Sequence, residues 1–279
     1  MNNIDFDWNA IDNTAQEAIP LSFPAVFWQH GSSQLAELGE KHWKYRGGLF
    51  FITDDDLGDS LPGWSPAKFN GDKDEVRGYA ATSAHVALIR SRRRWFQDDG
   101  SSKTYRPWDQ YQQGFRAQMQ VIGFIHGYDE PVSFSFKGLV VGFINNIIKE
   151  HYNKVVSVAN KTAPAGKKLP AYAIWLALKS GKFEKAGSGQ RQSEVTYPEI
   201  VLPKIVDHEY CVKRYVGNDN LIKFQELYHE LDGWAKEWEG GGLPIDEKKV
   251  AYEMQHPNIE ESPYPAAVSE PHDDDEPPF

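Results

Sequence analysis

The hydrophobic pattern between Gly48 and Gly181 is mainly that of β-strands. Alternation is clearest at the segment beginning with Val132, where Val132, Phe134 and Phe136 lie on one face of an extended chain. Turn-forming clusters, such as the one that ends in Gly100, separate the apolar runs. The pattern predicts strands over residues 48–53, 78–90, 118–127, 132–138 and 171–181.

Two segments have the spacing of helices instead. Residues 142–152 and 220–238 both repeat apolar positions at intervals of three and four, and Gly240–Gly242 ends the second segment. We expect the aromatic residues of both helices in the core. The pattern as a whole predicts an α+β body over residues 21–240, built as an OB-like β-barrel or a curved antiparallel sheet with flanking helices.

The two ends of the chain differ from this body in composition. Residues 1–20 are polar and acidic, which predicts an N-terminal arm. Residues 241–279 are acidic and rich in proline, with few branched aliphatic residues. Such a segment buries too little apolar surface to offset its ordering entropy, so it is predicted to be a disordered acidic tail.

Charge is segregated along the chain. The net formal charge is -10, yet residues 77–214 hold 21 Lys or Arg against 11 Asp or Glu, a local net of +10. A basic block attracts phosphates whatever the sign of the whole chain, which indicates a nucleic-acid partner for the body.

Aromatic residues are interleaved with this basic block between Arg77 and Trp108. Proteins that hold unpaired nucleotides without reading sequence use cations along the phosphates and rings that stack on bases. A second group of lysines surrounds the Pro/Gly loop at 160–170 and suits phosphate contacts, or only solubility. The predicted DNA contacts are Arg77, Arg90, Arg92, Arg93, Arg94, Trp95, Phe96, Lys103, Tyr105, Arg106, Trp108, Lys154, Lys161, Lys167 and Lys168.

The arginine run is expected in a hairpin whose loop spans Asp98–Lys103. Alternation places Arg92, Arg94 and Phe96 on one face and Arg93 and Trp95 on the other, so both sets cannot contact one strand of DNA. We favour Arg92 and Arg94 as the contacts. Trp95 is left open between a stacking platform and a core residue, and the run could also be a solvated edge strand that resists aggregation.

The last seven residues combine an acidic run with prolines and an aromatic carboxyl end. This tip offers an apolar plug, negative oxygens and a stiff spacer to a partner that has an apolar pocket with a cation at its rim. The predicted partner-binding residues are Asp273, Asp274, Asp275, Glu276, Pro277, Pro278 and Phe279.

That tip resembles the tail of bacterial single-stranded DNA-binding proteins, in which an acidic run leads to an aliphatic residue, Pro and a terminal Phe. Proline at 277 takes the aliphatic position here. Phage-encoded single-stranded DNA-binding proteins, with a divergent OB-type body, are the closer analogy. The resemblance implies a protein that protects single-stranded DNA and recruits replication, recombination and repair proteins through its tail.

Other function classes lack their motifs in the sequence. No apolar run reaches the roughly 20 residues of a membrane span, and no secretory signal is apparent, so we expect a cytoplasmic protein, in the bacterial host if phage-encoded. Its one cysteine, Cys211, is expected to be a packed thiol. No zinc spacing or phosphate-binding loop occurs, so no cofactor, metal or enzymatic activity is predicted.

Two alternatives to a DNA-binding protein remain at this stage. A metal-dependent nuclease could use acidic residues of the first 76, although the Asp54–Asp56 run is better explained as a turn. An acidic interaction factor that mimics DNA could instead use the two negative ends. The sequence leaves open the oligomeric state, including a homo-oligomer, and the preference between DNA and RNA.

Overall fold

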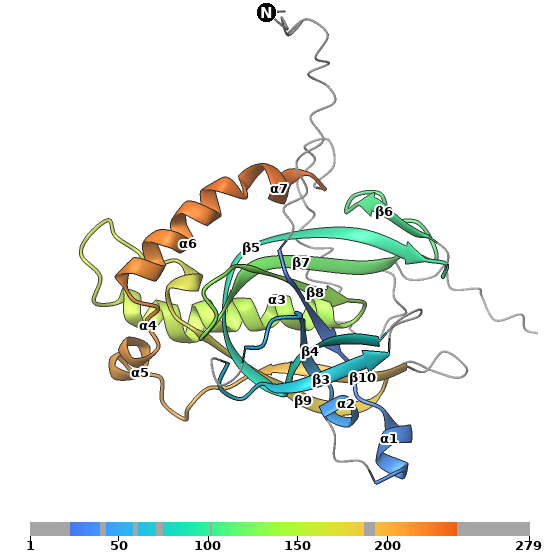
Figure 1. Cartoon of the computed structure of the whole chain (residues 1–279). Helices are drawn as coiled ribbons and strands as arrows, with labels where there is room; N and C mark the ends of the chain where they lie inside the picture. Colours follow the sequence, from blue (N-terminus) through green and yellow to red (C-terminus); the bar gives the residue numbers. More distant parts are fainter. Residues whose placement is uncertain are drawn as a thin grey trace, which may run out of the picture.

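A single curved sheet organises the described part of the chain. The structure, a computed structural model, describes residues 23–39, 43–57, 61–70, 75–100, 102–186 and 193–238 (Figure 1). Within these ranges ten strands form one sheet in the order β10-β9-β5-β7-β8-β1-β2-β4-β3, and β6 pairs with β5. The strands are β1 (Ala25–Gln29), β2 (Gly48–Ile52), β3 (Ser65–Asn70), β4 (Glu75–Ala81), β5 (Ser83–Asp98), β6 (Lys103–Pro107), β7 (Arg116–Ile125), β8 (Val132–Lys137), β9 (Leu176–Ala186) and β10 (Ser193–Ile200).

Helices cover both faces of the central strands. In Figure 1, α6 and α7 lie along one side of β5 and β7, and α3 lies along the other. The helical segments are α1 (Ser33–Glu37), α2 (Trp43–Arg46), α3 (Val140–His151), the π-helix η3 (Tyr152–Val156), α4 (Ser157–Asn160), the 3-10 turn η4 (Ala171–Ala173), α5 (His208–Lys213), α6 (Asn218–Glu230) and α7 (Asp232–Lys236).

The main core lies between the sheet and α3. Apolar positions spaced along α3 place Val140, Ile144 and Ile147 in the interior, where they pack with Phe134 and Phe136 of β8. All five side chains are buried. This face of β8 follows the period-two alternation seen in its sequence, so the strand and the helix bury complementary apolar surfaces.

The sheet curves until its β9–β10 end meets β1 and β2. The Trp28 indole N–H donates to the Thr196 carbonyl at 2.8 Å, and the Ser180 hydroxyl donates to the Gly47 carbonyl at 2.7 Å. Gly48, at φ +140°, makes this approach possible, because a Cβ there would lie 2.8 Å from the Ser180 hydroxyl oxygen of β9.

The predicted α+β class with flanking helices is confirmed, and the sheet is mixed. Every strand pair within the described ranges is antiparallel except β1 with β8, which is parallel. The predicted hairpin is present, with Asp98 paired to Lys103. The predicted helix over 220–238 is interrupted at Leu231, which separates α6 from α7. The predicted strand over 171–181 begins only at Leu176, after η4.

Three strands, β1, β3 and β10, were not predicted. β10 contains Pro198 beside a register shift, a position that an edge strand tolerates because proline donates no ladder hydrogen bond. The predicted arm at 1–20 and tail at 241–279 lie outside the described residues. None of the helices in the described ranges has the length and apolar character needed to cross a membrane.

Candidate nucleic-acid interface

One face of the strands β5 to β8 is polar and rich in cations. Residues directly opposite each other in an antiparallel pair share a face, and the pairs here are Arg94 with Gln118, Gln118 with Lys137, and Phe96 with Arg116. We call this surface the cationic face. Its basic residues come from four strands and are Arg90, Arg92, Arg94, Lys103, Arg116 and Lys137.

The arginine end of the cationic face is covered by α6 and α7. Arg90 lies 4.4 Å from the centre of the Tyr228 ring, and Arg92 lies 4.4 Å from that of Trp234. Arg94, only 8 % exposed, stacks on Tyr105 of β6 at 3.7 Å. The sequence placed Arg92 and Arg94 on one face correctly, but this end of the face is not open to solvent.

The other end of the cationic face is exposed. Arg116 and Lys137 are exposed there, and the Lys103 side chain is 57 % exposed in an ion pair with Asp98 at 3.8 Å. The Lys137 ammonium lies 4.8 Å from the centre of the buried Phe96 ring. This end therefore combines three cations within reach of a solvent-borne phosphate.

Burial and neighbouring positive charges lower the pKa values of two cations on this face. Desolvation, and the positive charges of Lys103 and Arg94, lower the pKa of Lys137 from its ordinary value. Burial, and the neighbouring Arg92, lower the pKa of Arg94 to about 10. Arg94, with a pKa of about 10, is protonated at neutral pH. Both lowered pKa values reflect first the desolvation of the cation and then the positive charges beside it.

Neutral polar groups and rings complete the cationic face. Gln118 accepts from Arg94 Nε at 2.9 Å and donates to the Ser135 hydroxyl at 2.9 Å, while Gln120 accepts from Arg92 Nε at 2.9 Å. Ser135 pairs with Phe27 of β1, which begins a cluster of aromatic side chains on the same face. The same sheet face therefore carries both cations and rings without any contribution from α7.

The opposite face of the hairpin belongs to the core. Trp95 is 2 % exposed, stacks on Trp108 at 4.4 Å, and donates its indole N–H to the Trp108 carbonyl at 2.7 Å. Arg93 donates to Asn145 of α3, and Arg106 lies over Phe115. The structure supports the interpretation of Trp95 as a core residue and not as a stacking platform. Phe96, on the cationic face, is also buried, at 6 % exposure.

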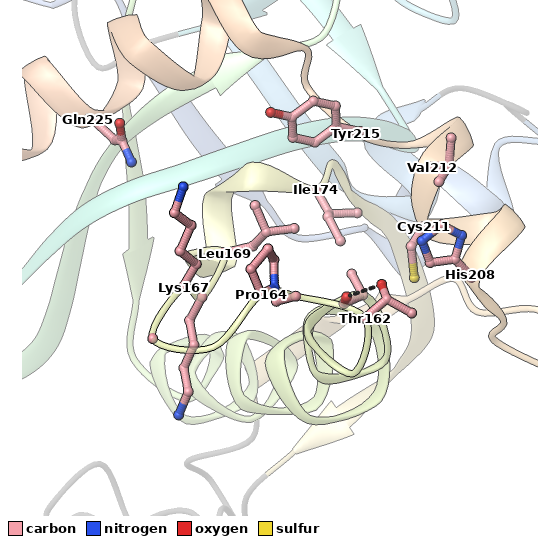
Figure 2. Close-up of a pocket in the computed structure, with 14 residues that line it drawn as sticks. Thr162, Pro164, Lys167, Leu169, Ile174, His208, Cys211, Val212, Tyr215 and Gln225 are labelled. Atoms are coloured by element: carbon pink, nitrogen blue, oxygen red, sulfur yellow. Dashed lines mark hydrogen bonds between the residues drawn. The ribbon is translucent and has the colours of Figure 1, made fainter.

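The lysine group forms a separate surface. Lys154, Lys161, Lys167 and Lys168 are all exposed, and Lys154 pairs with Glu150 at 2.6 Å. The loop that follows α4 forms one wall of a pocket of about 600 Å³, and α5 and the residues after it form another (Figure 2). Its lining is mostly apolar, with Lys167 and Lys168 at the loop and Cys211 buried in the wall. Arg77 lies on β4, which four other strands separate from β5 in the sheet order, and so belongs to neither surface.

The acidic run at Asp54–Asp56 lies in a bend that hydrogen bonds to Thr53 and Tyr79 hold. The Thr53 hydroxyl accepts from the Asp55 backbone N–H at 3.1 Å, and Asp56 accepts from the Tyr79 hydroxyl at 3.2 Å. Within the described ranges no group of three or more His, Cys, Asp or Glu side chains is placed to hold a metal ion. The tail residues Asp273–Phe279 lie outside those ranges.

Sequence reasoning missed Arg116, Lys137, Phe27 and the glutamines of β7. Arg116 and Lys137 are isolated charges in their own strands, and only strand pairing brings them beside Arg94. The signal available in the sequence was the alternation of β7 and β8, but it does not give the register.

Comparisons of the chain with protein-family models, curated proteins and solved structures find no match.

Proposed function

We propose that the protein binds single-stranded DNA without reading its base sequence, and that the cationic face holds the strand. The observation that carries the proposal is the alignment of six cations from four strands on one sheet face, which also carries the rings of Tyr105 and Phe27. Cations that follow the backbone and rings that stack on bases are the two needs of a sequence-independent single-strand site.

The chemistry of this face favours single strands over duplex. Stacking on an aromatic ring contributes about 1–3 kcal/mol per base, and a duplex hides its base faces from such rings. Arginine and lysine contacts to phosphate act on either form of DNA, because they read the backbone alone. Base stacking is therefore the term that discriminates, and phosphate contacts supply the salt-dependent affinity.

Three further parts of the proposal go beyond the site itself. The curved sheet with its cationic face supports an OB-like relationship of the body. The acidic tip Asp273–Phe279 would recruit replication, recombination and repair proteins, and its sequence resemblance is the support for this role. A cytoplasmic location agrees with both roles. Deletion of residues 270–279 removes five carboxylates and is expected to raise DNA affinity most at low salt.

A titration of fluorescently labelled dT oligonucleotide tests the proposal directly. Anisotropy is expected to rise with protein at low salt, to rise less with duplex of the same length, and to fall as salt is raised. Addition of Mg²⁺ should leave the oligonucleotide intact on a denaturing gel, whereas shortened products would favour the nuclease alternative. Absence of binding to dT in dilute buffer would reject the proposal.

A further inference from the structure

The segment Tyr228–Trp238 presents rings to the arginines of β5 in the same order as those arginines follow one another. Tyr228 faces Arg90, Trp234 faces Arg92, and Trp238 lies 5.3 Å from Arg94. The three arginines occupy alternate positions of one strand, so their guanidinium groups form a row. Each arginine of the row therefore has one aromatic ring of the covering segment against it.

Carboxylates are interleaved with these rings. Asp232 accepts from Arg90 at 2.6 Å, and Glu237 pairs with Arg92. The Trp238 carbonyl accepts from the backbone N–H of Trp108 at 3.0 Å. The arginine row thus meets alternating negative charges and flat rings, which is the pattern that phosphates and bases of a single strand would offer it.

The attachment of α7 is weak for a cover of this size. α7 has five residues, too few for a stable isolated helix, and its one buried side chain is Ala235. The side chains of Asp232 and Glu237 are 51 % and 46 % exposed, so solvent and salt screen both ion pairs. Among the described residues, the buried Trp238 indole N–H has no hydrogen-bond partner.

Arg94 has the least complete partner set of the row. Its guanidinium contacts two rings, which also lie against each other, and donates to the neutral Gln118; no carboxylate pairs with it among the described residues. Burial of Arg94 away from water is the main reason why its pKa is lowered. Glu237, which pairs with Arg92, acts on Arg94 only from a distance, so a phosphate at this position would give the Arg94 guanidinium a direct negative partner.

We infer that Tyr228–Trp238 occupies, as an internal mimic, a nucleic-acid subsite on the arginine row, and that single-stranded DNA displaces α7 to reach it. The inference rests on the proposed function and specifies its site. DNA would first meet the exposed cations Lys103, Arg116 and Lys137, and then replace the carboxylates and rings of the cover along Arg94, Arg92 and Arg90. The same exchange would break the ring contact of Trp238 with Tyr105 of β6.

The test uses the full chain with the double variant D232N/E237Q. Both substitutions keep side-chain shape and remove the two carboxylate charges that hold the arginine row. The matched control is E150Q/E209Q, which removes two carboxylates from the exposed ion pairs with Lys154 and Lys213, and therefore changes net charge equally. Affinity for dT is expected to be about two- to thirty-fold tighter in D232N/E237Q than in the control, because each half-exposed ion pair opposes displacement only modestly.

Hydrogen exchange supplies the second readout. With saturating dT, backbone amides of residues 233–237 should exchange faster than in the free protein, while those of β5 should be protected. Equal dT affinity of D232N/E237Q and its control, with α7 amides unchanged on binding, would overturn the inference and leave DNA binding intact. If neither the wild type nor any variant binds dT, the proposed function itself fails.

Discussion

Removal of two exposed cations from the cationic face should change the salt dependence of DNA binding by a defined amount. Arg116 and Lys137 are exposed at the uncovered end, on adjacent strands. Each cation that neutralises a phosphate of a single strand contributes about 0.7 to the slope of log affinity against log salt. The variant R116Q/K137Q is therefore expected to lower the slope by about 1.4.

The wild-type slope itself depends on how much of the face is used. Three exposed cations give a slope of about 2, and all six give about 4 when α7 is displaced. The decrease in slope of about 1.4 on substitution is the same in both cases, so it tests the assignment better than the wild-type slope does. When salt is raised from 50 to 200 mM, this difference in slope makes the loss of dT affinity about seven-fold smaller in the variant than in the wild type.

Anisotropy titrations of dT at four salt concentrations measure these slopes. The control K161Q/K167Q removes two exposed lysines from the loop beside the pocket, and so gives the same change in net charge. Its slope should stay at the wild-type value. A slope unchanged in R116Q/K137Q, or lowered equally in the control, would refute the assignment of phosphate contacts to the cationic face.

Four other changes test particular residues. F27A is expected to weaken dT binding by about 1–3 kcal/mol through lost stacking and to leave the salt slope unchanged; a purely structural role would appear as a lower urea midpoint with unaltered affinity per folded molecule. Because the pKa of Lys137 is lowered, dT affinity should decline with rising pH before 10.5, the ordinary lysine value, and K137R should remove this decline in the same titration. W95A should destabilise the fold by about 3–5 kcal/mol in urea unfolding, because the indole fills the core, and a near-neutral effect would contradict the buried assignment. Burial lowers the pKa of His151 below 6.5, and the unfolded chain binds the extra proton, so stability should fall as pH drops below 6.5; H151Q should show a smaller drop between pH 8 and 5.5 in urea midpoints, and His30 and His85, whose pKa values are also lowered, should contribute to the drop that is left.

The sequence by itself determined the local properties of this chain. Period-two alternation was enough to identify β8 and to separate Arg92 and Arg94 from Arg93 and Trp95. Helical spacing located α3 and α6, and the turn cluster at Gly100 located the β5–β6 hairpin. These features depend on neighbours within a few residues, which a sequence displays directly.

Only the tertiary structure decided which charges act together. Arg116 and Lys137 join Arg94 through strand register, a relation between segments that are distant in sequence. The tertiary structure also showed that the arginine row is covered. The helical spacing at 220–238 indicated that one face of the helix is buried, but not that this face packs on Arg90 and Arg92. Long-range pairing depends on the whole packing of the chain, so a basic and aromatic composition indicates a ligand class without giving the surface that binds it.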